Sequence, residues 1–271
     1  MKIKAKAKVN LILKVVNKRN DGYHNLQMLN TRINLYDTIY ISKSNTEDKL
    51  IYVDHPEYDT SSNNLILKTL KNFKTTFNIK SNYLIKIKKR IPFGAGLGGA
   101  SMDAGEVIKA VCKIEHIYIE KPKLVNYLKN FGADIPYSLY NTPCIVEGIG
   151  DIITPIQVEH QKFVLICPNI YVDTTTIFKE YKKQHQPSKT TNIIDDVKNK
   201  NYYNDLQKTA YEYSPELKKL SNQISHYGKI TMSGSGSALI LDTAENKSEV
   251  VSKLKKDYPL YIIKIIKIKS K

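Results

Sequence analysis

The sequence of 271 residues contains no tryptophan and only three cysteines, at positions 112, 144 and 167. Because the cysteines have no paired spacing, a disulfide framework and a zinc-binding cysteine pair are excluded, and reduced, mostly buried thiols are expected. The six histidines form no cluster with metal-ligand spacing, so we expect no metal site built by the protein. No apolar run approaches membrane-spanning length, and no apolar signal core precedes residue 20. These absences predict a cytoplasmic protein without a membrane partner.

Acidic residues are scarce relative to basic ones, since 26 Asp and Glu stand against 42 Lys and Arg, giving a formal charge of +16. Such an excess fits an anionic ligand, either nucleic acid or a phosphorylated small molecule. Lys, Asn, Ile and Tyr are all abundant, however, which indicates a biased base composition. No compact run of Lys and Arg interleaved with aromatic residues stands out. We therefore interpret most lysines as solvated surface residues and expect no nucleic-acid partner.

Glycine is concentrated in one place, because four of the twelve glycines lie between Gly94 and Gly99. Apolar residues alternate over 83–87, which predicts a β-strand leading into this loop. Apolar residues at helical spacing from Ala104 to Val111 predict a helix after it. Glycines let backbone N–H groups turn inward, and a helix N-terminus adds partial positive charge. The loop is therefore predicted to bind phosphate.

Other interpretations of the loop fit the residues less well. Three of its glycines match the dinucleotide fingerprint, but residues 114–123 are short and polar and lack the second apolar strand of a Rossmann unit. A Walker A loop is excluded because no Gly-Lys-Ser or Gly-Lys-Thr follows. A tight turn that binds nothing is the structural alternative, although so many flexible glycines before a helix cost backbone entropy. We expect Ser101 or Asp103 to cap the helix.

The first strand alternates apolar and polar residues from Ile3 to Val15 and is predicted to be half-buried. Lys8 and Asn10 lie two residues apart on its polar face, close enough to address one ligand. A solvated row of lysines is the simpler alternative. After the turn at 20–22, Tyr23 and His24 stand side by side. They could stack on and hydrogen-bond a planar base, or be a structural Tyr and a surface His.

An acid, Asp134, lies between a predicted helix stop at Gly132 and Pro136. A carboxylate held rigidly in an apolar segment suits a general base, and a helix cap is an equally good interpretation. A second glycine loop over 233–237 is expected either to join two strands as a hairpin or to close over a ligand. We predict two domains, 1–154 and 155–271.

These motifs together resemble the GHMP kinases, and the resemblance runs nearly end to end. The glycine loop and the last loop are shared across that superfamily. Two other elements, Asp-Gly-Tyr-His and Gly-Ala-Asp-Ile-Pro, point to the branch whose substrate carries cytidine diphosphate. The matching residues are 7–11 (Ala-Lys-Val-Asn-Leu), 21–24, 92–104, 132–136, 147–150 (Glu-Gly-Ile-Gly) and 233–236 (Ser-Gly-Ser-Gly).

The resemblance implies an α+β fold of two domains, the N-terminal one similar to domain 2 of ribosomal protein S5 and the C-terminal one an α/β sandwich. It implies phosphorylation, by ATP with Mg²⁺, of the 2-hydroxyl of a cytidine-diphosphate-linked methylerythritol in isoprenoid precursor synthesis. The protein is then expected to be a monomer or a weak homodimer.

Residue roles follow from the resemblance where the residues match. Asp134 would be the general base, Lys8 the lysine that supports it, and Asn10 a substrate contact. Tyr23 and His24 would hold the cytosine. The adenine would lie near Asn64 and Lys89, and the phosphates would be bound by Pro92, Gly94, Ala95, Gly96, Leu97, Gly98, Gly99, Ala100 and Ser101.

Three residues depart from the family pattern. Lys6 stands where a proline is usual, Ala100 where many relatives have a third consecutive glycine, and Met102 where many have a second serine. Two alternatives to the cytidyl kinase are considered. One is another GHMP kinase, acting on homoserine or phosphomevalonate, which Tyr23 and His24 disfavour. The other, from a different class, is a basic nucleic-acid-binding protein.

Overall fold

The computed structural model describes residues 1–181 and 192–268. The described chain forms two compact units. Unit 1 comprises residues 1–7, 35–93 and 98–141, and unit 2 comprises residues 8–34, 94–97 and 142 onward. The two longest strands, β1 (Lys2–Lys18) and β2 (His24–Ser44), contribute residues to both units. This division differs from a single boundary at 154/155, which stays a prediction about domains.

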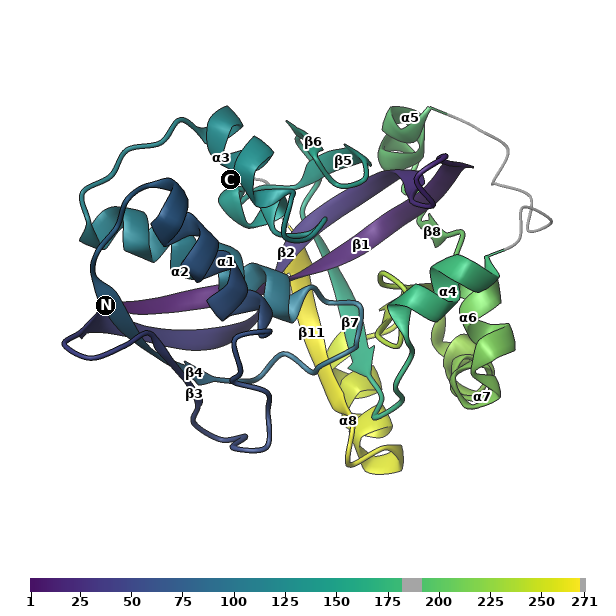
Figure 1. Ribbon diagram of the computed structural model, residues 1–271. Helices are drawn as coiled ribbons and strands as arrows, with labels where there is room; N and C mark the ends of the chain where they lie inside the picture. The colour runs from purple at the N-terminus through teal and green to yellow at the C-terminus, as the bar shows by residue number, and fades with distance from the viewer. Residues whose placement is uncertain (182–191, 269–271) are drawn as a thin grey trace. The chain divides into compact units, whose positions relative to one another are not determined.

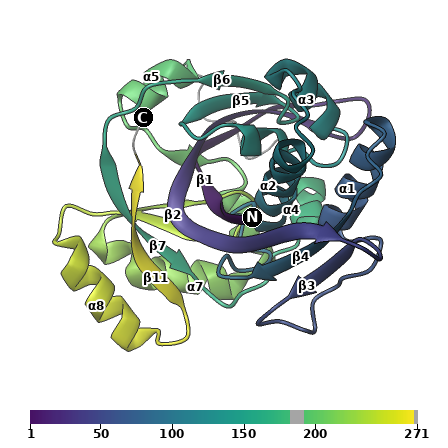
Figure 2. The same ribbon diagram turned by 90° about the vertical axis from the view of Figure 1, so that its left-hand side faces the viewer.

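Unit 1 is a sheet covered by helices. Strand β4 pairs antiparallel with β2, where Thr38 is opposite Lys88, and parallel with β3. Helices α1 and α2 lie over the same face of these strands (Figure 2). The elements are β3 (Lys49–Tyr52), α1 (Leu65–Thr76), β4 (Asn82–Lys88), α2 (Gly99–Ile114), α3 (Lys121–Leu128) and the 3-10 helix η1 (Pro136–Leu139).

The core of unit 1 explains why these segments fold as they do. Strand β4 alternates buried and exposed residues, and its buried Tyr83, Ile85 and Ile87 meet the apolar faces of the helices. Helix α2 is buried on most sides, because nine of its sixteen residues are buried. The predicted strand before the glycine loop and the predicted helix after it are both confirmed. Burial of these residues removes apolar surface from water, which is the main stabilising term.

Unit 2 contains a second, four-stranded antiparallel sheet in the order β11-β7-β10-β9. Separately, β5 pairs with β2 and β6, and β8 runs parallel to β1. Figure 1 shows α8 beside β11. The elements are β5 (Cys144–Gly148), β6 (Ile152–Pro155), β7 (Gln161–Cys167), α4 (Thr174–Glu180), α5 (Ile193–Lys198), β8 (Tyr203–Asn204), α6 (Gln207–Tyr213), α7 (Pro215–Ile224), η2 (Ser225–Tyr227), β9 (Lys229–Met232), β10 (Leu239–Asp242), α8 (Lys247–Asp257) and β11 (Ile262–Ile268).

Helix α7 has local sequence signals at both ends. Ser214 caps the helix by accepting a hydrogen bond from the Leu217 N–H, and Pro215 is the first helical residue. After the short η2 turn, Gly228 adopts φ 152° and ends the helical segment. Part of the Lys/Asn-rich connection, residues 182–191, lies outside the described residues.

Candidate active site

The glycine loop has the backbone conformation that only glycine adopts readily. Gly94, Gly96 and Gly98 have φ values of 65°, 70° and 67°. Gly98 is the N-cap of α2, and no side chain caps this helix. The first N–H groups of a helix have no partner within it, so the start of α2 offers donors and a dipole to an anion.

The expectation that Ser101 or Asp103 caps α2 is wrong. The helix begins at Gly99, so Asp103 lies one turn inside it, where it is fully buried. Its carboxyl accepts a hydrogen bond from Lys89 instead. A left-handed Gly98 starts the helix earlier than a Ser or Asp cap would. Met102, also fully buried, belongs to the interior of unit 1.

Within unit 2, the tip of the glycine loop (94–97) packs closely against the loop between β9 and β10. Ser233 Oγ donates to the Gly96 carbonyl at 2.9 Å, and the Ala238 N–H donates to the Ala95 carbonyl at 3.1 Å. A Cβ atom on Gly96 would lie 2.1 Å from the Ser233 carbonyl oxygen. The second glycine loop is thus a hairpin connection, as one interpretation predicted, and it holds the first loop in place.

Lys8 and Asn10 lie together, but not on a solvated face. Lys8 and Asn10 are only 3% and 0% exposed. Lys8 Nζ donates to Asn10 Oδ1 at 2.8 Å, and the Lys8 N–H donates to the Leu97 carbonyl at 3.0 Å. The solvated-row alternative is therefore wrong for these two residues. Their buried contact lies on the strand whose backbone bonds the tip of the glycine loop in unit 2.

Asn10 is further fixed by Asn30 of β2, a residue that the sequence did not single out. Asn10 Nδ2 donates to Asn30 Oδ1 at 2.5 Å, and the Asn10 N–H donates to Ser233 Oγ at 3.2 Å. The hydrogen bonds from Asn30 through Asn10 and Ser233 reach Gly96 without a break. Residues separated by about two hundred positions in the chain meet here, which no local spacing reveals.

The Tyr23 and His24 side chains have different surroundings in unit 2. Tyr23 is 64% exposed. The His24 ring lies 5.6 Å from Phe178 and 6.1 Å from Tyr181, measured between ring centroids. Burial and the nearby Lys18 charge lower the pKa of His24, which favours a neutral imidazole that donates at one nitrogen and accepts at the other. Phe178 and Tyr181 were not predicted, although their spacing of three on a helix was a readable signal.

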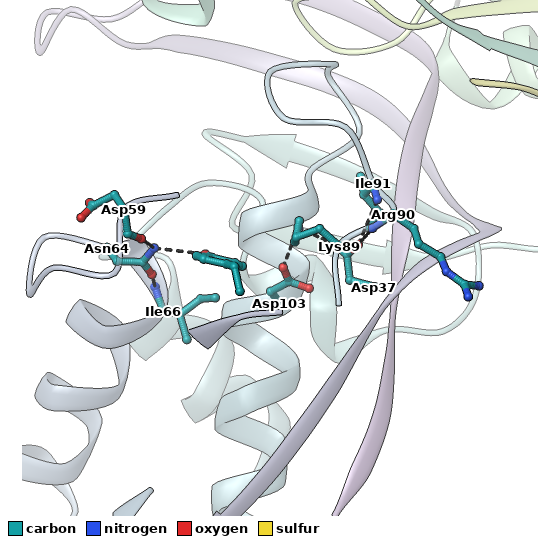
Figure 3. Close-up of polar contacts among 9 residues, drawn as sticks. Asp37, Asp59, Asn64, Ile66, Lys89, Arg90, Ile91 and Asp103 are labelled. Atoms are coloured by element: carbon teal, nitrogen blue, oxygen red, sulfur yellow. Dashed lines mark hydrogen bonds and ion pairs between the residues drawn. The ribbon is translucent and has the colours of Figure 1, made fainter. Parts of the chain in front are cut away.

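A buried charge cluster surrounds Lys89 in unit 1. Figure 3 shows its side chain reaching Asp103 on one side and Asp37 on the other. Lys89 Nζ donates to both carboxyls, at 2.8 Å in the case of Asp103. Asp37 also accepts from the Arg90 and Ile91 N–H groups, at 2.5 and 2.9 Å. Asp37 thus accepts three hydrogen bonds, whereas Asp103 Oδ1 is buried and without a partner in the described residues.

The cluster sets the charge states of its members. Burial works to lower the pKa of Lys89, but the Asp103 and Asp37 carboxylates outweigh it and raise that pKa. Burial raises the pKa of Asp103 to about 8, against the opposing effect of Lys89. Two carboxylates and one ammonium in a dry site favour retention of one proton, and Asp103, with fewer donors, holds it.

Asn64, the other residue predicted near the adenine, caps α1. Its Oδ1 accepts from the Ile66 N–H at 2.9 Å, while its Nδ2 donates to the Tyr52 hydroxyl and the Asp59 carbonyl (Figure 3). Asn64 and Lys89 both lie in unit 1, where Lys89 Nζ is 5.0 Å from the centroid of the Phe93 ring. Phe93 in turn packs on Tyr58. An aromatic surface thus accompanies the two polar residues.

Asp134 is half-buried in a turn of unit 1, two residues before η1. The N-cap residue of η1 is Ile135, so Asp134 does not occupy the N-cap position that one interpretation gave it. Ile135 and Pro136 are buried and anchor the turn. The general-base role of Asp134 stays a prediction.

Within residues 1–181 and 192–268, no group of three or more His, Cys, Asp or Glu side chains is arranged to hold a metal ion. In the same part of the chain, none of the helices combines the length and apolar character needed to cross a membrane.

Comparison with known proteins identifies the family. Residues 64–142 match the N-terminal domain of the GHMP kinases. A 4-diphosphocytidyl-2-C-methyl-D-erythritol kinase of Clostridium botulinum (strain Alaska E43 / Type E3) is 33% identical over 273 residues, covering 95% of this chain and 97% of the relative. The kinase of the same name from Clostridium tetani is 34% identical over 286 residues, covering 98% and 100%.

Solved structures share the fold. A crystal structure of 4-(cytidine 5'-diphospho)-2C-methyl-D-erythritol kinase superposes with a TM-score of 0.80 at 24% identity, covering 98% of this chain and 99% of the other. The mevalonate kinase of Methanococcus jannaschii gives a TM-score of 0.68 at 18% identity, covering 100% and 98%. The predicted α+β GHMP kinase fold is confirmed, and the chain belongs to the GHMP kinases, in the family of the 4-diphosphocytidyl-2-C-methyl-D-erythritol kinases.

Proposed function

We propose that this protein transfers the γ-phosphoryl group of ATP to the 2-hydroxyl of 4-diphosphocytidyl-2-C-methyl-D-erythritol, in the synthesis of isoprenoid precursors. The observation that carries the proposal is the identity of 33–34% to kinases of that name over nearly the whole chain. The positive-φ glycine loop before an uncapped helix supports a phosphoryl donor.

Phosphoryl transfer demands positioning and charge stabilisation more than covalent chemistry by the protein. In the proposed reaction, Asp134 accepts the proton of the attacking hydroxyl. Lys8, held by Asn10 at 2.8 Å, supplies positive charge to that reaction centre. Backbone N–H groups from Gly96 to Ser101 bind the ATP phosphates, and Asn64 and Lys89 face the adenine.

Mg²⁺ is proposed to accompany ATP. This ion keeps several waters and uses one or two protein ligands together with substrate phosphates, so a three-ligand protein cluster is not required. The half-buried Ser101 hydroxyl, in the first turn of α2, is suited to contact either a phosphate oxygen or the ion. When bound, Mg²⁺ would neutralise phosphate charge during transfer.

The cytidine is proposed to bind in unit 2 at Tyr23 and His24, together with Phe178. The exposed Tyr23 ring is available for stacking, and the lowered pKa of His24 favours a neutral imidazole that can pair with a base edge. A homoserine or phosphomevalonate kinase would have no use for such an aromatic site. We further propose a cytoplasmic monomer or weak homodimer without a nucleic-acid or membrane partner.

The decisive test is ADP release by the purified protein with ATP, Mg²⁺ and the diphosphocytidyl substrate, compared with homoserine and phosphomevalonate. The Asp134→Asn variant keeps the shape of the side chain but not its basicity, so kcat is expected to fall by roughly 10²–10⁴. Binding of ATP, measured by calorimetry, should be nearly unchanged. ADP release that is indifferent to the cytidyl substrate, or an Asp134→Asn variant with normal turnover, would refute the proposal.

A further inference from the structure

Asn30 is a buried polar residue of β2 that the proposed reaction does not use directly. It is 0% exposed, and its Oδ1 accepts the hydrogen bond from Asn10 Nδ2 at 2.5 Å. Asn10 Oδ1 in turn accepts from Lys8 Nζ at 2.8 Å. All three residues belong to unit 2.

Because the Lys8 ammonium can only donate, it identifies which end of each of the two amides is the oxygen. An ammonium only donates, so the Asn10 atom that faces it must be the oxygen. The Nδ2 of Asn10 must then point away from Lys8, toward Asn30. The Asn30 atom that meets it must therefore be an acceptor, which is Oδ1. The order of donors and acceptors is fixed from Lys8 to Asn30.

The backbone of Asn10 is fixed independently of this chain of amides. Its N–H donates to Ser233 Oγ at 3.2 Å, and Ser233 Oγ–H donates to the Gly96 carbonyl. What these contacts leave undetermined is the rotation of the Asn10 amide about its last torsion. Besides Asn30 Oδ1, Asn10 Nδ2 meets the Met28 sulfur, at 3.4 Å, which is a weak acceptor.

Asn30 Oδ1 provides the strong acceptor that Asn10 Nδ2 needs, but the other end of the Asn30 amide is left without a hydrogen bond in the described part of the chain. Its Nδ2 is buried and has no partner among the residues that the structure describes. A buried donor without an acceptor is unfavourable, and such groups are rare in native proteins. An apolar side chain, as at Met28 on the same face of β2, would avoid that cost. The presence of an amide despite this cost indicates that the Asn30 oxygen has a function.

We propose that Asn30 is a positioning residue for phosphoryl transfer, which acts by orienting the Asn10 amide and thereby holding the Lys8 ammonium. The proposal rests on the proposed function, in which Lys8 serves the reaction centre. Without the acceptor at position 30, Asn10 Nδ2 keeps only the weak Met28 sulfur acceptor, so the amide orientation that presents Oδ1 to Lys8 is held less firmly. The reaction rate should suffer, while ATP binding should not.

The test compares Asn30→Leu, which removes the acceptor at similar volume, with Asn30→Asp, which retains it. For Asn30→Leu, kcat is expected to fall about tenfold or more while the KM for ATP stays within about twofold. Asn30→Asp should recover most of the lost kcat. The control is Thr31→Val, because Thr31 is also buried and its side chain leaves β2 on the opposite face. It should leave kcat unchanged.

A double-mutant cycle separates positioning from a general structural role. If Asn30 acts only through Asn10, adding Asn30→Leu to Asn10→Ala should cause no further loss of kcat. Additive losses, an Asn30→Leu enzyme with normal kcat, or equal damage by Asn30→Leu and Asn30→Asp would overturn the proposal.

A readout without turnover distinguishes this proposal from the proposed function. Acetylation of Lys8 by acetic anhydride, followed by peptide mass spectrometry, reports how firmly the amine is held. Its rate should rise in Asn30→Leu and stay at the wild-type value in Thr31→Val. If the protein failed to phosphorylate the cytidyl substrate but Lys8 reactivity rose as expected, the positioning inference would stand and the substrate assignment would fall. Unchanged reactivity would refute the positioning role.

Discussion

At the scale of single residues, the Lys89 ammonium donates hydrogen bonds to two buried carboxyls. Asp37 accepts hydrogen bonds from two backbone N–H groups as well as from Lys89. Asp103 has Lys89 and one oxygen without a partner in the described chain. The Asp103 carboxyl is therefore the member of the cluster that keeps a proton near neutral pH. Tyr52 and Tyr58, whose pKa values burial raises, are further titratable groups near the cluster.

The proton held by Asp103 leads to a prediction of how the free energy of unfolding depends on pH. The unfolded chain releases it near the ordinary value of 3.8, whereas the folded protein holds it until about 8. Between these values the folded state binds more protons, so the free energy of unfolding contributed by Asp103 falls as pH rises. Above about 8 both states have lost the proton and the effect stops changing. Melting temperatures measured from pH 5 to 8 should fall less steeply for Asp103→Asn than for the wild-type protein.

A matched control separates this effect from a change in net charge. Asp54 is exposed in the same unit and pairs with Lys88 at 3.5 Å, so Asp54→Asn removes one carboxyl without touching the cluster. Its melting temperatures should run parallel to those of the wild-type protein. Parallel curves for Asp103→Asn as well would mean that Asp103 is ionised throughout this range.

The sequence identified Lys89 but could not identify its partners. Asp37 lies 52 positions and Asp103 14 positions away, on two different elements. Asp103 was read as a helix cap because a carboxylate near a helix start is most often one. Burial decided otherwise, since the interior of unit 1 surrounds it. Tertiary partners of this kind appear only once the strands and helices have been packed.

At the scale of elements, the glycine loop was predictable because its signals are local. An alternating strand, four glycines and a helical period follow one another within about thirty residues, and each signal needs only its neighbours. The close contact between residues 94–97 and the β9–β10 loop was not predictable in this way. It depends on a pairing across 137 positions, from Ser233 to Gly96.

That contact leads to a prediction for Gly96→Ala. Gly96 has φ 70°, and a Cβ atom there would approach the Ser233 carbonyl oxygen to 2.1 Å, so the two loops must separate. We expect a lower melting temperature and a raised KM for ATP, because the phosphate-binding loop loses its support. Differential scanning fluorimetry and steady-state kinetics measure the two effects.

Gly22→Ala is the matched control for backbone strain alone. Gly22 has φ 86°, and a Cβ atom there meets nothing within 4 Å. The change should therefore cost only the strain of a left-handed alanine, about 1 kcal/mol, and leave the KM for ATP unaltered. If Gly96→Ala lowered stability no more than Gly22→Ala and left ATP kinetics intact, the contact between the loops would have no role in ATP binding.

The departure at Met102 also has an explanation at this scale. Met102 is 0% exposed and lies in the first turn of α2. A residue at this position fills the core, whereas Ser101, which is half-buried, is the hydroxyl of the first turn. The departure from serine at this position therefore places an apolar side chain in a buried environment.

At the scale of the whole molecule, the fold class was predictable from the resemblance, whereas the division into units was not derivable from the residues. Sequence reasoning placed one boundary near Pro155, where two strands flank a proline. The compact units instead alternate along the chain, because β1 and β2 are long enough to take part in both. A single boundary in the sequence cannot describe a strand that is shared between two units.

The net charge of +16 was interpreted as mostly solvated lysine, and the structure adds one qualification. In unit 1, Lys4 Nζ lies 4.7 Å and Arg90 Cζ 5.8 Å from the centroid of the Tyr36 ring, while Lys2 Nζ lies 5.5 Å from that of Tyr40. Basic groups beside aromatic rings are the composition of single-strand nucleic-acid surfaces. We call these five residues the basic aromatic patch.

We expect the basic aromatic patch to bind nucleic acid only weakly. Its cations are already paired with the rings of Tyr36 and Tyr40, and Lys4 lowers the pKa of Tyr36, so a base would have to compete for the same faces. Binding that relies on phosphate contacts falls with salt, and for a single strand held by the three cations of the patch the loss between 50 and 200 mM is about twentyfold. Titration of a labelled single-stranded RNA at both salt concentrations measures this.

Lys2→Ser with Lys4→Ser should abolish the low-salt binding and leave phosphorylation untouched. The opposite result would be nanomolar, sequence-selective binding at 150 mM salt that disappears in this double variant, and it would make nucleic acid a physiological partner. Desolvated, sequence-dependent contacts resist screening by salt, whereas the attraction of a diffuse lysine excess does not.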